Sequence, residues 1–132
     1  MIKKISHIGI AVKNLDSAKE MYKKLLQTEP SEPEYVAEQK VNVVKFKVGE
    51  SVIELLEGTS GDSEITRFIE KRGEGIHHIA YESDNINSEI ERLDESGFDF
   101  TGKDPKTGSD NMLISFIKPK SIGGVLTEIC QH

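Results

Sequence analysis

Two histidines and two glutamates occupy matching places in the two halves of this chain. His78 follows His7 by 71 positions, and each lies in a run rich in apolar residues. Each half then carries a glutamate inside an apolar stretch, with Glu54 47 positions after His7 and Glu128 50 positions after His78. A buried carboxylate among aliphatic neighbours is costly without a partner, whereas a bound cation offsets that cost. The repeat therefore predicts one divalent metal site at the junction of two modules.

The residue types narrow the chemistry of that site. Two imidazoles and two carboxylates suit Co, Mn, Ni, Zn or Fe, and they do not select among these ions. Four protein ligands on a six-coordinate ion leave two positions for a bidentate substrate, on which the ion acts as a Lewis acid. Taken singly, a histidine in a strand is more often a hydrogen-bonded core residue, so the joint pattern carries the prediction. His77 points to the other face of its strand and is expected to pack or to support a ligand, whereas no role is expected for the terminal His132.

The order of elements repeats as well. Alternating and helical periodicities predict an α+β fold of two βαβββ modules in a single domain over 1–132. Module 1 covers about 4–57, a connecting helix about 61–72 and module 2 about 75–130. Asn14 or Asp16 is expected to cap the first helix and Asp62 the connecting helix, and Gly49-Glu50 is expected to form a hairpin turn. In module 2 we expect strands near 76–82, 98–101, 112–117 and 124–130, with a helix at about 86–96.

Composition excludes several classes of protein. The net charge of −6 argues against a nucleic-acid partner, because no basic patch offsets it. No apolar run approaches the roughly 20 residues that cross a bilayer, so a cytoplasmic protein without a membrane partner is expected. Cys130 is the single cysteine, which rules out a disulfide within the chain. Its place in an alternating strand favours a buried thiol.

Three stretches carry a resemblance to a known family. They are "HIGIAVKNLDSAKEMYKKLL" at 7–26, "VIELLEGTSGDSEITRFIEKRGEGIHHIA" at 52–80 and "KPKSIGGVLTEI" at 118–129. Together they resemble the methylmalonyl-CoA epimerase family of the vicinal oxygen chelate, or glyoxalase, superfamily. The strand-plus-histidine matches are shared by the whole superfamily, whereas the run at 62–80 and the ending at 123–129 are more specific to the epimerases. The resemblance covers nearly the whole chain.

The resemblance implies an isomerase that interconverts the 2R and 2S forms of methylmalonyl-CoA. The family's ligand positions fall on His7, Glu54, His78 and Glu128, with one divalent ion per chain that stabilises an enolate after C2 deprotonation. In this family the metal-bound carboxylate that corresponds to Glu128 is a base. Superfamily members also suggest a homodimer with a metal site in each chain.

The chain departs from the family pattern at three places. The strand that holds the second acid or base in the family corresponds to 39–43 and contains no carboxylate, which leaves Glu54 and Glu38 as weak candidates. The loop at 107–112 lacks the usual histidine, and Lys118 stands where a histidine is usual. Lys118, Lys120 and Ser121 could still contact the phosphates of an acyl-CoA thioester, although solvated surface lysines are an equal alternative.

Three other functions remain as alternatives. A glyoxalase I-type lactoylglutathione lyase, or a lyase acting on another thiol, would use similar ligands. Its glutathione-type members have an arginine where this chain has Ala11, which favours the epimerase. A binding module without catalysis would usually have lost metal ligands. A ring-cleaving dioxygenase fits poorly with 6% aromatic residues and no tryptophan.

Overall fold

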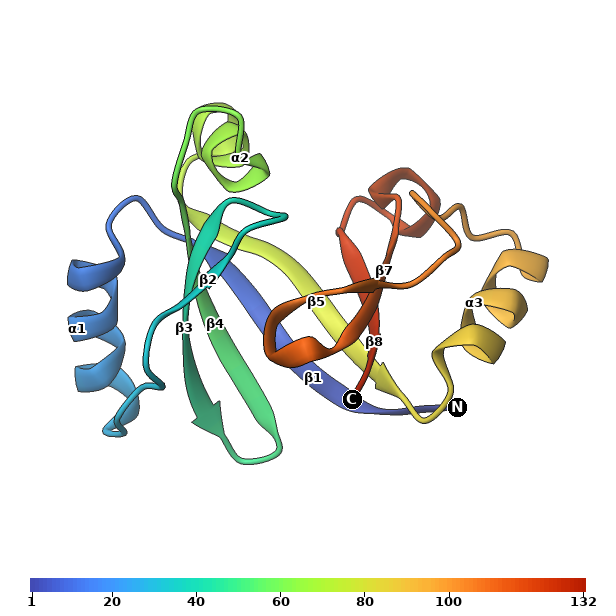
Figure 1. Ribbon diagram of the computed structural model, residues 1–132, viewed down its shortest axis with the longest axis horizontal. Helices are drawn as coiled ribbons and strands as arrows, with labels where there is room; N and C mark the ends of the chain where they lie inside the picture. The colour runs from blue at the N-terminus through green and yellow to red at the C-terminus, as the bar shows by residue number, and fades with distance from the viewer. The chain divides into compact units, whose positions relative to one another are not determined.

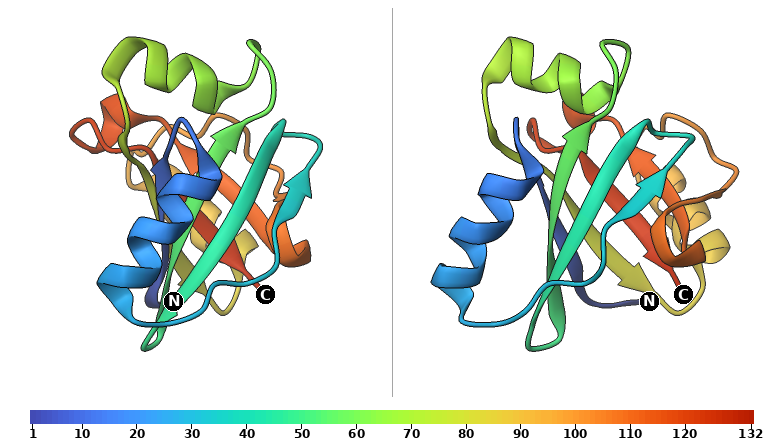
Figure 2. Two further views of the ribbon diagram at one scale, coloured as in Figure 1. Left: turned by 90° about the vertical axis from the view of Figure 1, so that its left-hand side faces the viewer. Right: turned by 60° about the vertical axis from the view of Figure 1, so that its left-hand side comes forward.

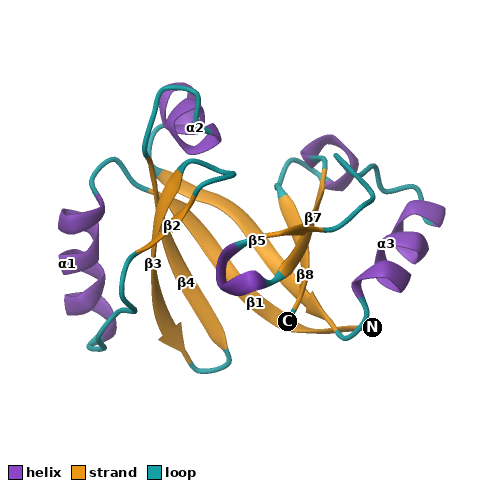
Figure 3. Ribbon diagram, viewed as in Figure 1, coloured by secondary structure: helices purple, strands orange, loops and turns teal.

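The computed structural model describes all 132 residues, Met1–His132, and has an α+β fold (Figures 1 and 3). Helices and strands follow the predicted order of two βαβββ modules joined by a helix. The chain divides into two compact units, Ile8–His77 and a second unit composed of Met1–His7 with His78–His132. Strand β1, Ile2–Ala11, contributes its first residues to the second unit and its last residues to the first. The single domain over 1–132 stays a prediction.

The Ile8–His77 unit orders its strands β2-β3-β4-β1. Its elements are β2 (Glu34–Val36), β3 (Val41–Val48), β4 (Ser51–Gly58), α1 (Leu15–Leu26) and α2 (Glu64–Arg72). Strands β3 and β4 form the predicted hairpin, in which Val48 pairs with Ser51 and the turn residue Gly49 has a φ of 61°. That positive φ favours glycine, which has no Cβ to clash.

Two apolar clusters hold this unit together. One lies where α1 packs on β3 and β4, seen in the turned views of Figure 2, and includes Phe46 and Leu55, both 0% exposed. The other joins Val43 and Leu56 to Ile65 of α2. Because alternate residues of a strand face opposite sides, β3 and β4 supply both clusters at once.

The second unit orders its strands β1-β5-β8-β7-β6. Its further elements are β5 (Gly75–Ser83), α3 (Ile86–Glu95), β6 (Lys106–Thr107), β7 (Leu113–Ile117), β8 (Thr127–Gln131) and the 3-10 turns η1 (Ser109–Asn111) and η2 (Pro119–Ile122). Strand β8 is parallel to β5 and antiparallel to β7, so it is a central strand with a neighbour on each side. Helix α3 packs on β7 and β8 through Ile90 and Leu93.

The helix starts confirm the repeat and correct one prediction. Asn14 caps α1 by accepting from the Ser17 amide, and Asn85 caps α3 by accepting from the Ser88 amide. Ser63, not Asp62, caps α2, and its hydroxyl accepts from the Ile65 amide. The carboxylate of Asp62 instead binds Lys40 and the Ser60 hydroxyl.

The predicted strand at 98–101 is also wrong. Only Phe100 forms an isolated bridge, with Ile117. The apolar residues of this segment serve packing rather than a ladder, because Phe98 and Phe100 join the cluster around α3. The segment that follows contains the short strand β6, which pairs with β7. No helix of the chain is long and apolar enough to cross a bilayer.

Candidate metal centre

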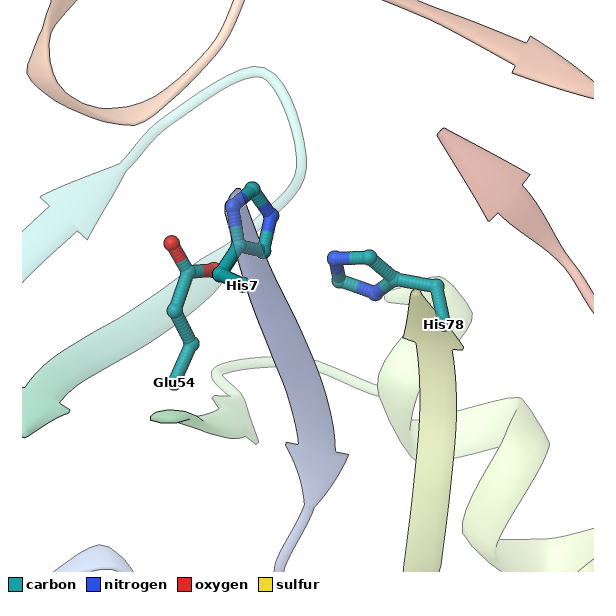
Figure 4. Close-up of side chains that lie close together, drawn as sticks. All are labelled: His7, Glu54 and His78. Atoms are coloured by element: carbon teal, nitrogen blue, oxygen red, sulfur yellow. The ribbon is translucent and has the colours of Figure 1, made fainter. Parts of the chain in front are cut away.

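Strands β1 and β5 bring two imidazoles together. The ring centroids of His7 and His78 lie 5.2 Å apart, with the planes at 88° (Figure 4). Both residues are buried, 3% and 5% exposed. Their positions on strands rather than loops hold the two rings in a defined geometry, which suits a preorganised site.

Strand β8 adds a carboxylate to this pair. In the parallel pairing of β5 and β8, Glu128 lies opposite Ala80, two residues after His78 and therefore on the same face of the sheet. Glu128 Oε2 lies 3.3 Å from Nε2 of His7, and Oε1 lies 3.5 Å from Nε2 of His78. Three of the four predicted ligands thus meet within the second unit.

Each imidazole has a different neighbour that orients it. The hydroxyl oxygen of Ser6 lies 3.0 Å from Nδ1 of His7. If Nδ1 carries the proton and donates it to this oxygen, Nε2 keeps its lone pair for a metal ion, the arrangement typical of ligating histidines. The ring of His78 makes an edge contact with Phe116 of β7, with centroids 6.0 Å apart. Sequence reasoning missed both neighbours, although Ser6 stands directly beside a predicted ligand.

The surroundings of Glu128 fit a cation. The residue is 3% exposed, and its Oε2 has no hydrogen-bond partner, even though His7 Nε2 is 3.3 Å away. A buried carboxylate oxygen without a hydrogen bond is rare and costly. A positive charge between this oxygen and the imidazole nitrogens would satisfy it, and imidazole with carboxylate is a donor set for divalent first-row metals. The residues present therefore fit a divalent ion.

Glu54, the fourth predicted ligand, lies on β4 in the other unit and is also drawn in Figure 4. It is 4% exposed, and its Oε2 lies 3.8 Å from the ammonium of Lys45 on β3. Sequence reasoning missed Lys45, but the signal was present. A hairpin that turns at Gly49-Glu50 puts position 45 opposite position 54, which is the observed register.

His77 packs against α2, which is one of the two roles expected of it. Its ring makes an edge contact with Phe68 of α2, with centroids 5.1 Å apart. Burial lowers the pKa of His77 to about 4, so the ring is neutral at pH 7. No role is expected for His132, whose Nε2 lies 3.5 Å from Glu82.

The predicted phosphate-binding residues lie at η2, and two of them already have partners. The ammonium of Lys118 lies 3.4 Å from Asp99. The hydroxyl of Ser121 donates to the carbonyl of Lys118 and accepts from the amide of Asp99, so it stabilises the turn. Lys120 is exposed, which leaves its ammonium accessible to a ligand.

Known proteins resemble this chain over nearly its whole length. The model of the glyoxalase/bleomycin resistance protein/dioxygenase superfamily matches residues 6–116. The ethylmalonyl-CoA/methylmalonyl-CoA epimerase of Cereibacter sphaeroides is 35% identical over 99% of this chain and 99% of its own length. The uncharacterised protein YqjC of Bacillus subtilis is 35% identical over 97% of this chain and 91% of its own.

A solved structure agrees. A Streptomyces coelicolor methylmalonyl-CoA epimerase variant, in complex with 2-nitronate-propionyl-CoA, superposes with a TM-score of 0.95 at 33% identity, covering 99% of this chain and 95% of the other. The family model covers well over half of the chain, and the relatives exceed 30% identity across almost all of it. The chain therefore belongs to the glyoxalase/bleomycin resistance protein/dioxygenase superfamily and, within it, to the methylmalonyl-CoA epimerase family of isomerases.

Proposed function

We propose that this isomerase is a divalent-metal-dependent epimerase of methylmalonyl-CoA, which interconverts the 2R and 2S forms by removing the proton at C2. The observation that carries the proposal is the buried carboxylate of Glu128, which lies beside two imidazoles and has one oxygen without a hydrogen bond. A base with a free lone pair in a desolvated setting is what abstraction of a weakly acidic carbon-bound proton requires.

The two carboxylate oxygens of Glu128 face different imidazoles, which supports this role, because one oxygen can bind the ion while the other accepts a proton. In the proposed step the C2–H bond breaks, the proton goes to the carboxylate of Glu128, and the electron pair delocalises onto the thioester oxygen. Burial of the carboxylate excludes water that would compete for the proton.

His7, His78 and Glu128 would hold the ion, and Glu54 is proposed as the fourth ligand from its equivalence to Glu128 in the repeat. A bound divalent ion supplies Lewis acidity toward the substrate's two carbonyl oxygens. Ser6 and Phe116 keep the imidazoles oriented for this binding. Two imidazoles with carboxylates suit several divalent metals, and this donor set does not select among them.

Epimerisation also needs an acid on the opposite face of C2. The segment predicted to correspond to the family's second acid or base carries none, and its Val43 lies in an apolar cluster. Glu38 is exposed in the turn before β3. We therefore keep Glu54 as the candidate, with Lys45 as the cation that pairs with it.

The proposed substrate is an acyl-CoA thioester, since relatives in this family are named for such substrates and one is solved with an acyl-CoA analogue. Lys120, with Lys118 and Ser121 beside it, is proposed to contact the CoA phosphates. Lys120→Ala should raise KM more than Lys118→Ala, because only Lys118 already pairs with an aspartate. Both variants should leave kcat little changed, and steady-state kinetics decide this.

The first experiment follows C2 proton exchange. The purified protein with Co²⁺ and a single epimer of methylmalonyl-CoA in D₂O should incorporate deuterium at C2 while the substrate racemises, as NMR would record. Chelation with EDTA should stop the exchange. Absence of exchange with either epimer would contradict the proposal, and rapid turnover of methylglyoxal with glutathione would replace it with the lyase.

A further inference from the structure

Strand β8 places a sulfur beside the carboxylate of the candidate metal centre. Cys130 follows Glu128 by two positions, so both side chains point to the same face of the sheet. The neighbouring strands confirm this placement, because Glu82 of β5 and Ile114 of β7 lie opposite Cys130. Cys130 is 0% exposed. The epimerase reaction described above has no use for this thiol.

The thiol is near enough to share a cation. His7, Glu128 and Cys130 each offer a ligand atom, and the three atoms all lie within 4.8 Å of one another. In a tetrahedral zinc site with ordinary metal–sulfur and metal–nitrogen bonds, such atoms are roughly 3.5 Å apart. A shift of about an ångström, within the reach of side-chain rotation, would therefore close the set around an ion.

A second observation points to a cation at this place. Oε2 of Glu128, the oxygen closest to His7, is buried and has no hydrogen-bond partner. Membership of Cys130 in an apolar cluster with Ala80, Met112 and Ile114 explains why the thiol is buried. That packing does not satisfy the oxygen beside it, whereas a cation at this place would, with the sulfur near enough to be a further ligand.

We propose that Cys130 provides this centre with a thiolate ligand for soft divalent cations, so that Cd²⁺ or Zn²⁺ binds through His7, Glu128 and Cys130. On binding, a metal–sulfur bond forms, the S–H bond breaks and its proton passes to solvent. Harder ions such as Mn²⁺ prefer oxygen donors and would not use the sulfur.

The inference deepens the metal dependence on which the proposed function rests, and it predicts a selectivity. Thiophilic ions would be held by His7, Glu128 and Cys130, whereas harder ions would be held without the sulfur. The protein should therefore distinguish Cd²⁺ from Mn²⁺ by ligand set and not only by affinity.

The test is a titration of the full chain with Cd²⁺, followed by ultraviolet absorption. A sulfur-to-cadmium charge-transfer band should grow to one equivalent, and its loss in Cys130→Ser should accompany Cd²⁺ binding that is weaker by about tenfold or more. His7→Ala should weaken the band, and Mn²⁺ should produce none. Because a buried substitution can unfold the chain, Cys130→Ala is measured in parallel, with circular dichroism to show that both variants keep their secondary structure.

The outcomes separate the two proposals. Cd²⁺ that binds without a charge-transfer band, or with equal affinity to folded Cys130→Ser and Cys130→Ala, would overturn the thiolate ligand. If that happens while Co²⁺-dependent C2 exchange proceeds, the proposed function stands alone. If the band appears but no malonyl-type thioester exchanges its proton, the soft-ion site stands and the proposed substrate fails.

Discussion

Glu54 and Glu128 occupy corresponding places in the two modules, yet their cross-strand neighbours differ in kind. Lys45 of β3 lies opposite Glu54, and its ammonium is 3.8 Å from the carboxylate. The equivalent position opposite Glu128 is Phe116 of β7, whose ring contacts His78. An ammonium thus lies opposite one carboxylate, and an aromatic ring lies opposite the other.

The difference assigns the two carboxylates unequal chemistry. An ammonium at this distance competes with any metal ion for the oxygens of Glu54. Glu128 has no lysine or arginine partner, so it needs an added cation and remains available as a base. Duplication supplied two equivalent positions, and a single residue on the neighbouring strand distinguishes them.

The largest effect on activity is expected from substitutions of the two glutamates themselves. Glu128→Gln should slow C2 proton exchange by about 10²–10⁴-fold, the usual contribution of a general base, while most of the metal is retained. Glu54→Gln should slow C2 proton exchange less than about tenfold, because the amide oxygen can still coordinate and Glu128, the proposed base for proton removal, is intact. Isotope exchange and metal analysis of both variants test the contrast. Equal losses would show that the two carboxylates act alike.

A second variant tests how Ser6 holds the imidazole of His7 in place. Ser6→Ala should weaken Co²⁺ binding by about 10–100-fold, because Nδ1 of His7 loses the oxygen that fixes its orientation. Isothermal titration calorimetry measures the affinity. Ser115→Ala is the matched control, a buried serine whose hydroxyl donates to Gly102 instead. An affinity unchanged in Ser6→Ala would remove this role.

The third prediction concerns stability without metal. Lys45→Met removes the ammonium that lies beside the buried carboxylate of Glu54. This loss should lower the free energy of unfolding by about 1–3 kcal/mol. Adding Glu54→Gln should restore part of the loss. Urea denaturation in EDTA measures both variants. If the double variant is no more stable than Lys45→Met, the pair is not coupled.

The smallest effect lies at the surface, away from buried charge. Hydrogen bonds from Lys40 and Ser60 lower the pKa of Asp62 to about 2, from an ordinary 3.8. The stabilisation is therefore present above pH 3.8 and is lost as pH falls through 2. Lys40→Met should flatten this part of the acid-denaturation curve only slightly, because the pair is exposed. A large change in the acid-denaturation curve would show that solvent does not screen the Lys40–Asp62 ion pair.

Much of the fold could be predicted from the sequence because its signals are local. Asn14, one of the two residues expected to cap the first helix, does so, and Asn85 caps α3 at the matching place in the repeat. The segment at 98–101 misled because two phenylalanines are equally typical of a strand and of a packed loop. Their contacts with α3 decided between the two, and no local pattern records such contacts.

The sequence by itself determined that His7, His78, Glu54 and Glu128 are the residues to consider, because a duplicated pattern is visible in one dimension. Only the tertiary structure decided what surrounds them. Strand register put Lys45 opposite one glutamate and Phe116 opposite the other, and the parallel pairing of β5 with β8 put Glu128 and Cys130 on the face of His78. Lys45 is nine positions from Glu54, across a hairpin that the sequence predicts, whereas His7 and His78 are 121 and 50 positions from Glu128. The surroundings of Glu128 therefore follow only from the pairing of strands that are distant in the chain.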